Sequence, residues 1–124
     1  MSKNVEQKIQ IELIKWISFH YPEILKVYVK NEGKKNIIAA TLDKKMGLCK
    51  GHPDLHLEID RDYTYIFKLE LKTKSAIKKK NKGLTDSQVE WWSDFKPTLN
   101  KQGVVAYGLI EAQKKIKEWI DGLE

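Results

Sequence analysis

Two acidic residues and a lysine are the first feature of the sequence that could do chemistry. Asp54 follows the segment Gly51-His52-Pro53, and Glu70 and Lys72 are separated by one residue. On an extended strand, residues i and i+2 share a face roughly 7 Å apart, so Glu70 and Lys72 should point the same way. If the strand that begins after Asp54 pairs with the strand of Glu70, two carboxylates and an ammonium meet at one end of a sheet.

These three groups suit metal-assisted hydrolysis of a phosphodiester. Mg2+ prefers oxygen ligands, usually one or two carboxylates completed by waters and substrate phosphate. Two carboxylates without a cation repel each other by about 4 kcal/mol at ~4 Å and an effective dielectric constant of ~20. A lysine can hold the attacking water and offset charge on the phosphate, while a metal lowers the pKa of that water. The alternative is a solvated strand edge that carries charged residues by chance.

Alternating residues predict the two strands that position this triplet. Leu55, Leu57 and Ile59 follow the period of a half-buried strand, a turn follows at residues 60–62, and a second run extends over 63–73. The second run places two sets of side chains on opposite faces: Tyr65, Phe67, Leu69 and Leu71 on one, and Lys68, Glu70 and Lys72 on the other.

A first helix is predicted over about residues 4–20, because apolar residues recur there at helical spacing. Glu6 falls inside the apolar arc, where an unpartnered carboxylate is costly. It could complement the helix dipole in the first turn, or it could reach the metal site. A short strand is predicted at residues 27–29 and a short helix over about 36–45.

Thr85 and Gln88 have the spacing of a capping box, which predicts a helix that begins there. Gln88 is also the polar member of an apolar stripe, so it could either serve only the cap or support Lys72 and the water. Trp91 and Trp92 are expected in the core. A short strand at 104–107 and a helix over 111–121 complete the chain.

Size and composition indicate one basic domain spanning residues 1–124. The chain has 124 residues, a net charge of +6 and a single cysteine, Cys49. No apolar run approaches the ~20 residues that span a bilayer, so no membrane partner is expected, and the lone cysteine favours a reducing cytoplasm. Lysines crowd behind the triplet, either as a solvated loop or as a clamp on a phosphate backbone: Lys74, Lys78, Lys79, Lys80 and Lys82.

Three histidines remain, and none has metal-ligand spacing. His20 and His52 are isolated in the sequence, and His56 alternates with the apolar residues of its strand. We expect His56 to be an exposed strand residue.

Taken together, the motifs resemble those of the VRR-NUC family in the PD-(D/E)XK nuclease superfamily. The matching pieces run along nearly the whole chain: Glu6…Gln10, Asn31-Glu32-Gly33, Met46-Gly47…Gly51-x-Pro53-Asp54-Leu55, Leu69-Glu70-Leu71-Lys72-Thr73 and Leu84-Thr85-x-x-Gln88-x-x-Trp91. The resemblance implies an α/β fold with a restriction-endonuclease-like αβββαβ core, in which helices flank a mixed sheet. His52 and the long basic loop at 76–82 depart from the family pattern.

The resemblance also implies roles for individual residues. Asp54 and Glu70 would bind Mg2+ with the Leu71 carbonyl, Lys72 would act on the nucleophile with support from Gln88, and Glu6 would complete the acidic cluster. Mn2+ is expected to substitute for Mg2+. Stand-alone members resemble small junction-resolving enzymes that act as homodimers, and two symmetric cuts in a four-way junction fit a two-fold dimer.

The sequence therefore favours a metal-dependent, structure-selective DNA endonuclease that cuts branched DNA such as four-way (Holliday) junctions. Within the same class, a flap or restriction-like endonuclease is the alternative. A non-catalytic nucleic-acid-binding module on the same fold, or a basic adaptor protein, would belong to a different class. A module that has lost catalysis should have a degenerate acidic pair, whereas Asp54, Glu70 and Lys72 are all present.

Overall fold

The computed structural model describes residues 2–29 and 51–123, with side chains described for 5–24 and 51–123. The expected helix at 36–45 and the motif pieces at 31–33 and 46–47 lie outside these ranges. Four strands form one mixed sheet in the order β1-β2-β3-β4. They are β1 (Ile24–Val29), β2 (Leu55–Asp60), β3 (Thr64–Lys72) and β4 (Lys101–Tyr107). Strand β2 pairs antiparallel with both β1 and β3, and β4 runs parallel to β3.

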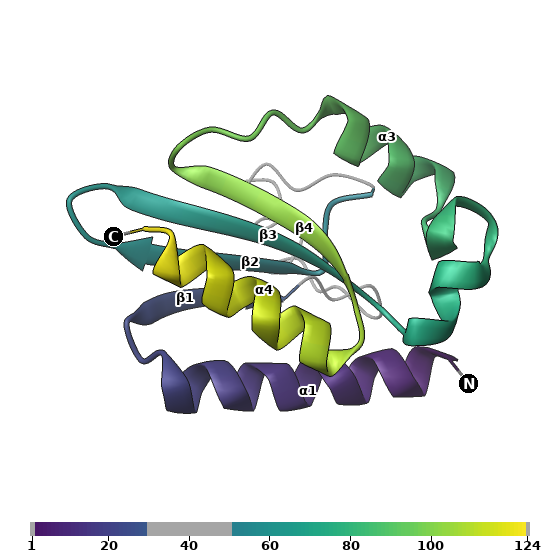
Figure 1. Cartoon of the computed structure of the whole chain (residues 1–124), viewed down its shortest axis with the longest axis horizontal. Helices are drawn as coiled ribbons and strands as arrows, with labels where there is room; N and C mark the ends of the chain where they lie inside the picture. Colours follow the sequence, from purple (N-terminus) through teal and green to yellow (C-terminus); the bar gives the residue numbers. More distant parts are fainter. Residues whose placement is uncertain (1, 30–50, 124) are drawn as a thin grey trace, which may run out of the picture.

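Helices flank the sheet, as the sequence predicts. Helices α1 (Ser2–His20) and α4 (Leu109–Asp121) lie together over one face, whereas α3 (Asp86–Asp94) lies on the other side (Figure 1). Between β3 and α3 the chain forms two short 3-10 turns, η1 (Lys74–Lys78) and η2 (Lys80–Gly83). The α/β class and the mixed sheet flanked by helices are thus confirmed. None of the helices within residues 2–29 and 51–123 is long and apolar enough to cross a membrane.

The apolar core lies between the sheet and the α1/α4 layer. Alternate residues of the two central strands point into it, which is the pattern that the sequence predicts. The core brings these strand residues together with apolar residues of both helices: Leu55, Leu57, Ile59, Phe67, Leu69, Leu71, Leu13, Ile17, Ala112 and Ile116. Because one face of the sheet is filled in this way, the intervening polar residues of β2 and β3 must lie on the α3 side.

Candidate active site

The pairing of β2 with β3 brings Asp54 to the end of β3. Leu55 lies opposite Leu69 in the antiparallel register, so Asp54, one residue earlier, reaches the level of Glu70. The backbone N–H of Leu71 donates a hydrogen bond to Asp54 Oδ2 at 3.0 Å. This bond fixes the orientation of a half-buried carboxylate directly beside the segment that carries Glu70 and Lys72.

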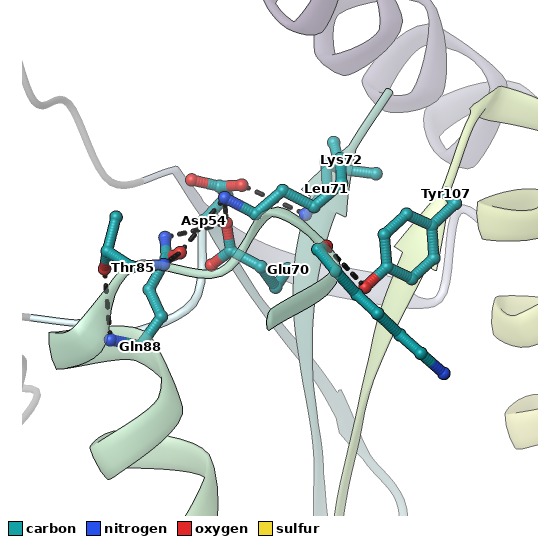
Figure 2. A network of polar contacts seen from close by, with 8 residues as sticks. Asp54, Glu70, Leu71, Lys72, Thr85, Gln88 and Tyr107 are labelled. Atoms are coloured by element: carbon teal, nitrogen blue, oxygen red, sulfur yellow. Dashed lines mark hydrogen bonds and ion pairs between the residues drawn. The ribbon is translucent and has the colours of Figure 1, made fainter. Parts of the chain in front are cut away.

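Glu70 and Lys72 share the α3 face of β3, and Gln88 joins them. Lys72 Nζ lies 3.7 Å from Glu70 Oε2, with the two side chains 11% and 1% exposed. Gln88 Nε2 donates to Glu70 Oε2 at 3.2 Å, and Gln88 Oε1 accepts from Lys72 Nζ at 3.0 Å. Figure 2 shows Asp54, Glu70 and Lys72 turned toward one another, with Gln88 reaching them from α3.

The same Gln88 also completes the predicted capping box. Its Oε1 accepts from the Thr85 N–H at 2.9 Å, and the Gln88 N–H donates to Thr85 Oγ1 at 3.2 Å. The two interpretations of Gln88 are therefore compatible, since one amide caps α3 and contacts the polar cluster. The cap orders the first turn of α3, and that turn determines where the amide lies.

Gly51 allows α3 to pack closely against the segment at residues 51–54 that leads into β2. Its φ of +87° is a left-handed conformation that favours glycine. A Cβ atom at this position would overlap the carbonyl oxygen of Ser87, one residue before Gln88. The backbone of the segment leading to Asp54 therefore packs directly on the start of the helix that carries Gln88.

The chemistry of the donors suits a hard divalent cation. Asp54 and Glu70 would supply carboxylate oxygens and Leu71 a carbonyl oxygen, and with the Lys72 ammonium the formal charges of these groups sum to −1. No three His, Cys, Asp or Glu side chains gather into a metal-binding group within the described ranges. Hence half-buried Glu6, on α1, does not join Asp54 and Glu70 in such a group. Mg2+ commonly completes its shell with waters and phosphate, so a two-carboxylate set still fits it.

A second polar network lies two residues back along β3, and the sequence prediction missed it. Lys68, His52 and His56 are all buried. Lys68 Nζ lies 2.9 Å from His52 Nε2 and 2.6 Å from His56 Nδ1. The prediction that His56 is exposed is therefore wrong, because its ring is buried between Lys68 and Glu58. The pairing of β2 with β3 could have indicated this network, because it places His56 directly opposite Lys68.

The partners of each ring define a consistent set of tautomers for this network. With Lys68 donating to both histidines, His52 carries its proton on Nδ1 and donates to the Pro53 carbonyl at 2.8 Å. Likewise, His56 donates from Nε2 to Glu58 Oε1 at 2.9 Å. Burial, followed by the charge of Lys101, lowers the pKa of Lys68 to about 8, and Glu58 opposes the shift. The network thus holds the Pro53 carbonyl, one residue before Asp54.

The predicted nucleic-acid-binding lysines surround this end of the sheet. All five of them are exposed on or beside η1 and η2: Lys74, Lys78, Lys79, Lys80 and Lys82. The Tyr107 hydroxyl, on β4, donates to the Lys82 carbonyl at 2.9 Å and ties the loop to the sheet (Figure 2). Burial, with smaller contributions from Glu111 and Glu70, raises the pKa of Tyr107, so its hydroxyl keeps the proton that this bond requires.

Comparison with known proteins agrees with this fold. A solved structure named VRR_NUC domain protein superposes with a TM-score of 0.60 at 22% sequence identity, covering 94% of this chain and 88% of that chain. No protein-family model matches the sequence, and no curated protein matches it significantly. At this identity the likeness shows the shared fold, so the activity must be argued from the site.

Proposed function

We propose that the chain is a metal-dependent DNA endonuclease of the VRR-NUC type that hydrolyses phosphodiester bonds. The observation that carries the proposal is the convergence of Asp54, Glu70 and Lys72 at one sheet end, with Gln88 bonded to two of them. If these residues only formed a solvated strand edge, their side chains would be exposed to water. Instead, Glu70 and Lys72 are buried. The similar fold of a VRR_NUC domain protein supports the same conclusion.

Each residue then has a defined task. Asp54, Glu70 and the Leu71 carbonyl would hold Mg2+, or Mn2+ in its place, and the bound ion would acidify a water and polarise the phosphate. The Lys72 ammonium has three N–H donors: one donates to Gln88 Oε1, and a second can point toward Glu70, whose Oε2 lies 3.7 Å from Nζ. The third can hold the attacking water or a phosphate oxygen. Gln88 keeps the ammonium and the Glu70 carboxylate in fixed orientations.

We further propose that the substrate is branched DNA, with four-way junctions as the first candidate, and that two copies act as a homodimer. The exposed lysines at 74, 78, 79, 80 and 82 would contact phosphates on the strands that flank the cut. A protomer of 14.5 kDa is small relative to a branched substrate, and a two-fold dimer supplies one site for each symmetric cut.

Cleavage of labelled junction, flap, duplex and single-stranded DNA tests the activity, with Mg2+, Mn2+ or EDTA in the buffer. Asp54→Ala and Lys72→Ala should abolish cutting, while Asp62→Ala, which removes an exposed acid in the β2–β3 turn, should cut like the wild type. Binding by Asp54→Ala should persist or tighten, because one negative charge near the phosphate is gone. If no substrate is cut with any metal while binding remains tight, the chain is a non-catalytic module.

A separate measurement tests the lysine loop. Replacing Lys78, Lys79 and Lys80 with alanine should weaken DNA binding and flatten the plot of log K against log salt, by up to about 0.9 for each phosphate that is no longer neutralised. The matched control replaces Lys8, Lys15 and Lys117, which removes the same charge from helices α1 and α4. Equal slopes for the two triple variants would show that the loop does not touch DNA.

A further inference from the structure

A pocket beside the candidate site carries lysines that the proposed cleavage does not use. It lies where β4 passes into α4, and we call it the α4 pocket. Its lining residues are Lys74, Tyr107, Ile110, Glu111, Lys114 and Lys115. Lys72 is the register partner of Tyr107, and its carbonyl accepts from the Gly108 N–H at 2.8 Å. The pocket therefore adjoins the end of β3 that carries the candidate site.

The charges that line the α4 pocket favour an anion. Three lysines face one acid, Glu111, which gives the lining a formal charge of +2. Glu111 Oε1 accepts a hydrogen bond from the Tyr107 N–H at 3.1 Å, so a backbone donor already holds this carboxylate. A phosphodiester carries a single negative charge, so the net positive lining would attract it.

The aliphatic stem of Lys74 lies close to the backbone where β4 passes into α4. It lies across Gly108, where a Cβ would come within 3.1 Å of Lys74 Cγ and 3.3 Å of Lys74 Cε. Lysine loses much side-chain entropy when it is fixed by a ligand. Contact between this stem and Gly108 would reduce the number of conformations that Lys74 loses on binding.

An apolar residue distinguishes nucleic acid from a free phosphate ion as the occupant. Ile110 is 71% exposed although it lines a pocket with three lysines. An inorganic phosphate would gain nothing from this side chain, whereas a deoxyribose next to a phosphate would bury part of it. The combination of cations and one exposed aliphatic group matches the sugar-phosphate backbone of nucleic acid.

We infer that the α4 pocket binds a sugar-phosphate of the DNA backbone that flanks the one cut at the candidate site. This inference rests on the proposed function for the nature of the substrate. It extends the DNA contact from the lysine loop, past Tyr107, onto α4, so that Lys114 and Lys115 contribute to binding and not to bond cleavage.

DNA binding in EDTA tests the inference without any need for cleavage. The full chain would be titrated into a labelled DNA duplex and a labelled four-way junction at several salt concentrations, followed by fluorescence anisotropy. Lys114→Ala/Lys115→Ala should weaken binding and reduce the salt slope by about 0.9 for each phosphate that these lysines neutralise. The control Lys8→Ala/Lys117→Ala removes the same charge outside the pocket. A second pair compares Ile110→Glu with Leu99→Glu, since Leu99 is 88% exposed and lies outside the pocket lining.

The outcomes separate this inference from the proposed function. Weaker binding and a smaller slope for the two pocket variants than for their controls would support it. Equal behaviour of pocket and control variants on both DNAs would overturn it. A chain that binds DNA through the pocket but cuts nothing would refute only the endonuclease.

Discussion

Gln88 shows how much one side chain can do when it stands between a helix end and a polar cluster. Its amide caps α3 through Thr85 and bonds to both Glu70 and Lys72. A change at this position therefore affects both the stability of the helix start and the geometry of the candidate site, and a matched variant is needed to separate the two.

The first prediction compares Gln88→Leu with Thr85→Ala. Both break the capping box and should each lower the free energy of unfolding by about 1 kcal/mol, measured by urea denaturation. Only Gln88→Leu removes the partner of Lys72 and Glu70, so it alone should slow cleavage, by roughly 10- to 100-fold if a misplaced ammonium costs about 1.4–2.7 kcal/mol. If both variants lost the same amount of cleavage activity, Gln88 would affect cleavage only by capping α3.

Lys68 gives a prediction about pH and stability at the same scale. Its pKa is about 8 in the fold, against 10.5 for the unfolded chain. Between these values the unfolded state binds the extra proton, so the contribution of this group to stability rises as pH increases from 8 to 10.5 and is constant below 8. In EDTA, the difference in unfolding free energy between wild type and Lys68→Met should therefore shift in favour of wild type over this interval. A pH-independent difference would contradict the shift.

At the scale of elements, the contact between the strand entry and α3 decides how the site is assembled. The loop at Gly51 and the helix start at Ser87 are distant in sequence, yet a Cβ on Gly51 would overlap the Ser87 carbonyl. Asp54 follows the first of these segments and Gln88 the second, so this backbone packing sets the distance between two parts of the candidate site.

Gly51→Ala tests that packing. The change adds a clash and forces alanine into a positive φ, so we expect a loss of about 2 kcal/mol or more in unfolding free energy, together with weaker cleavage. The control is Gly122→Ala, because Gly122 has φ −76° at the end of α4 and needs no left-handed conformation. Thermal unfolding of both variants checks the difference. A Gly51→Ala variant as stable as Gly122→Ala would show that α3 does not rest on this glycine.

At the scale of the whole molecule, the proposed homodimer would present two copies of the basic surface that surrounds the candidate site. One protomer presents one candidate site, the η1/η2 lysines and the α4 pocket at the same end of the sheet. Two symmetric cuts require a second copy of this surface. The two proposals can be tested separately, because protomer mass and DNA binding are measured in different experiments.

Sedimentation equilibrium tests the assembly. A homodimer should have twice the protomer mass of 14.5 kDa, and that mass should persist at the high salt that weakens DNA binding. At protein concentrations below the dissociation constant of the dimer, the rate of junction cleavage should decrease. The rate of cleavage of a simple flap should change less. A mass of one protomer at all concentrations, with junction cutting intact, would exclude the dimer.

The sequence alone determined what depends on local geometry. The two-residue period of a strand placed Glu70 and Lys72 on one face, and the spacing of Thr85 and Gln88 marked the start of α3 within one residue. The order of strands and helices followed from the same periodicities, and the excess of lysine followed from composition.

Only the tertiary structure decided which polar groups are buried and which partners they meet. The strand pattern of His56 is that of an exposed residue, but its side chain is buried and Lys68 lies opposite it in register. Glu6 lies in the apolar arc of α1, yet it joins no three-ligand group with Asp54 and Glu70 in the described part of the chain. Periodicity is set by the backbone of one element, whereas burial and partnership depend on segments far apart in sequence that pack against each other.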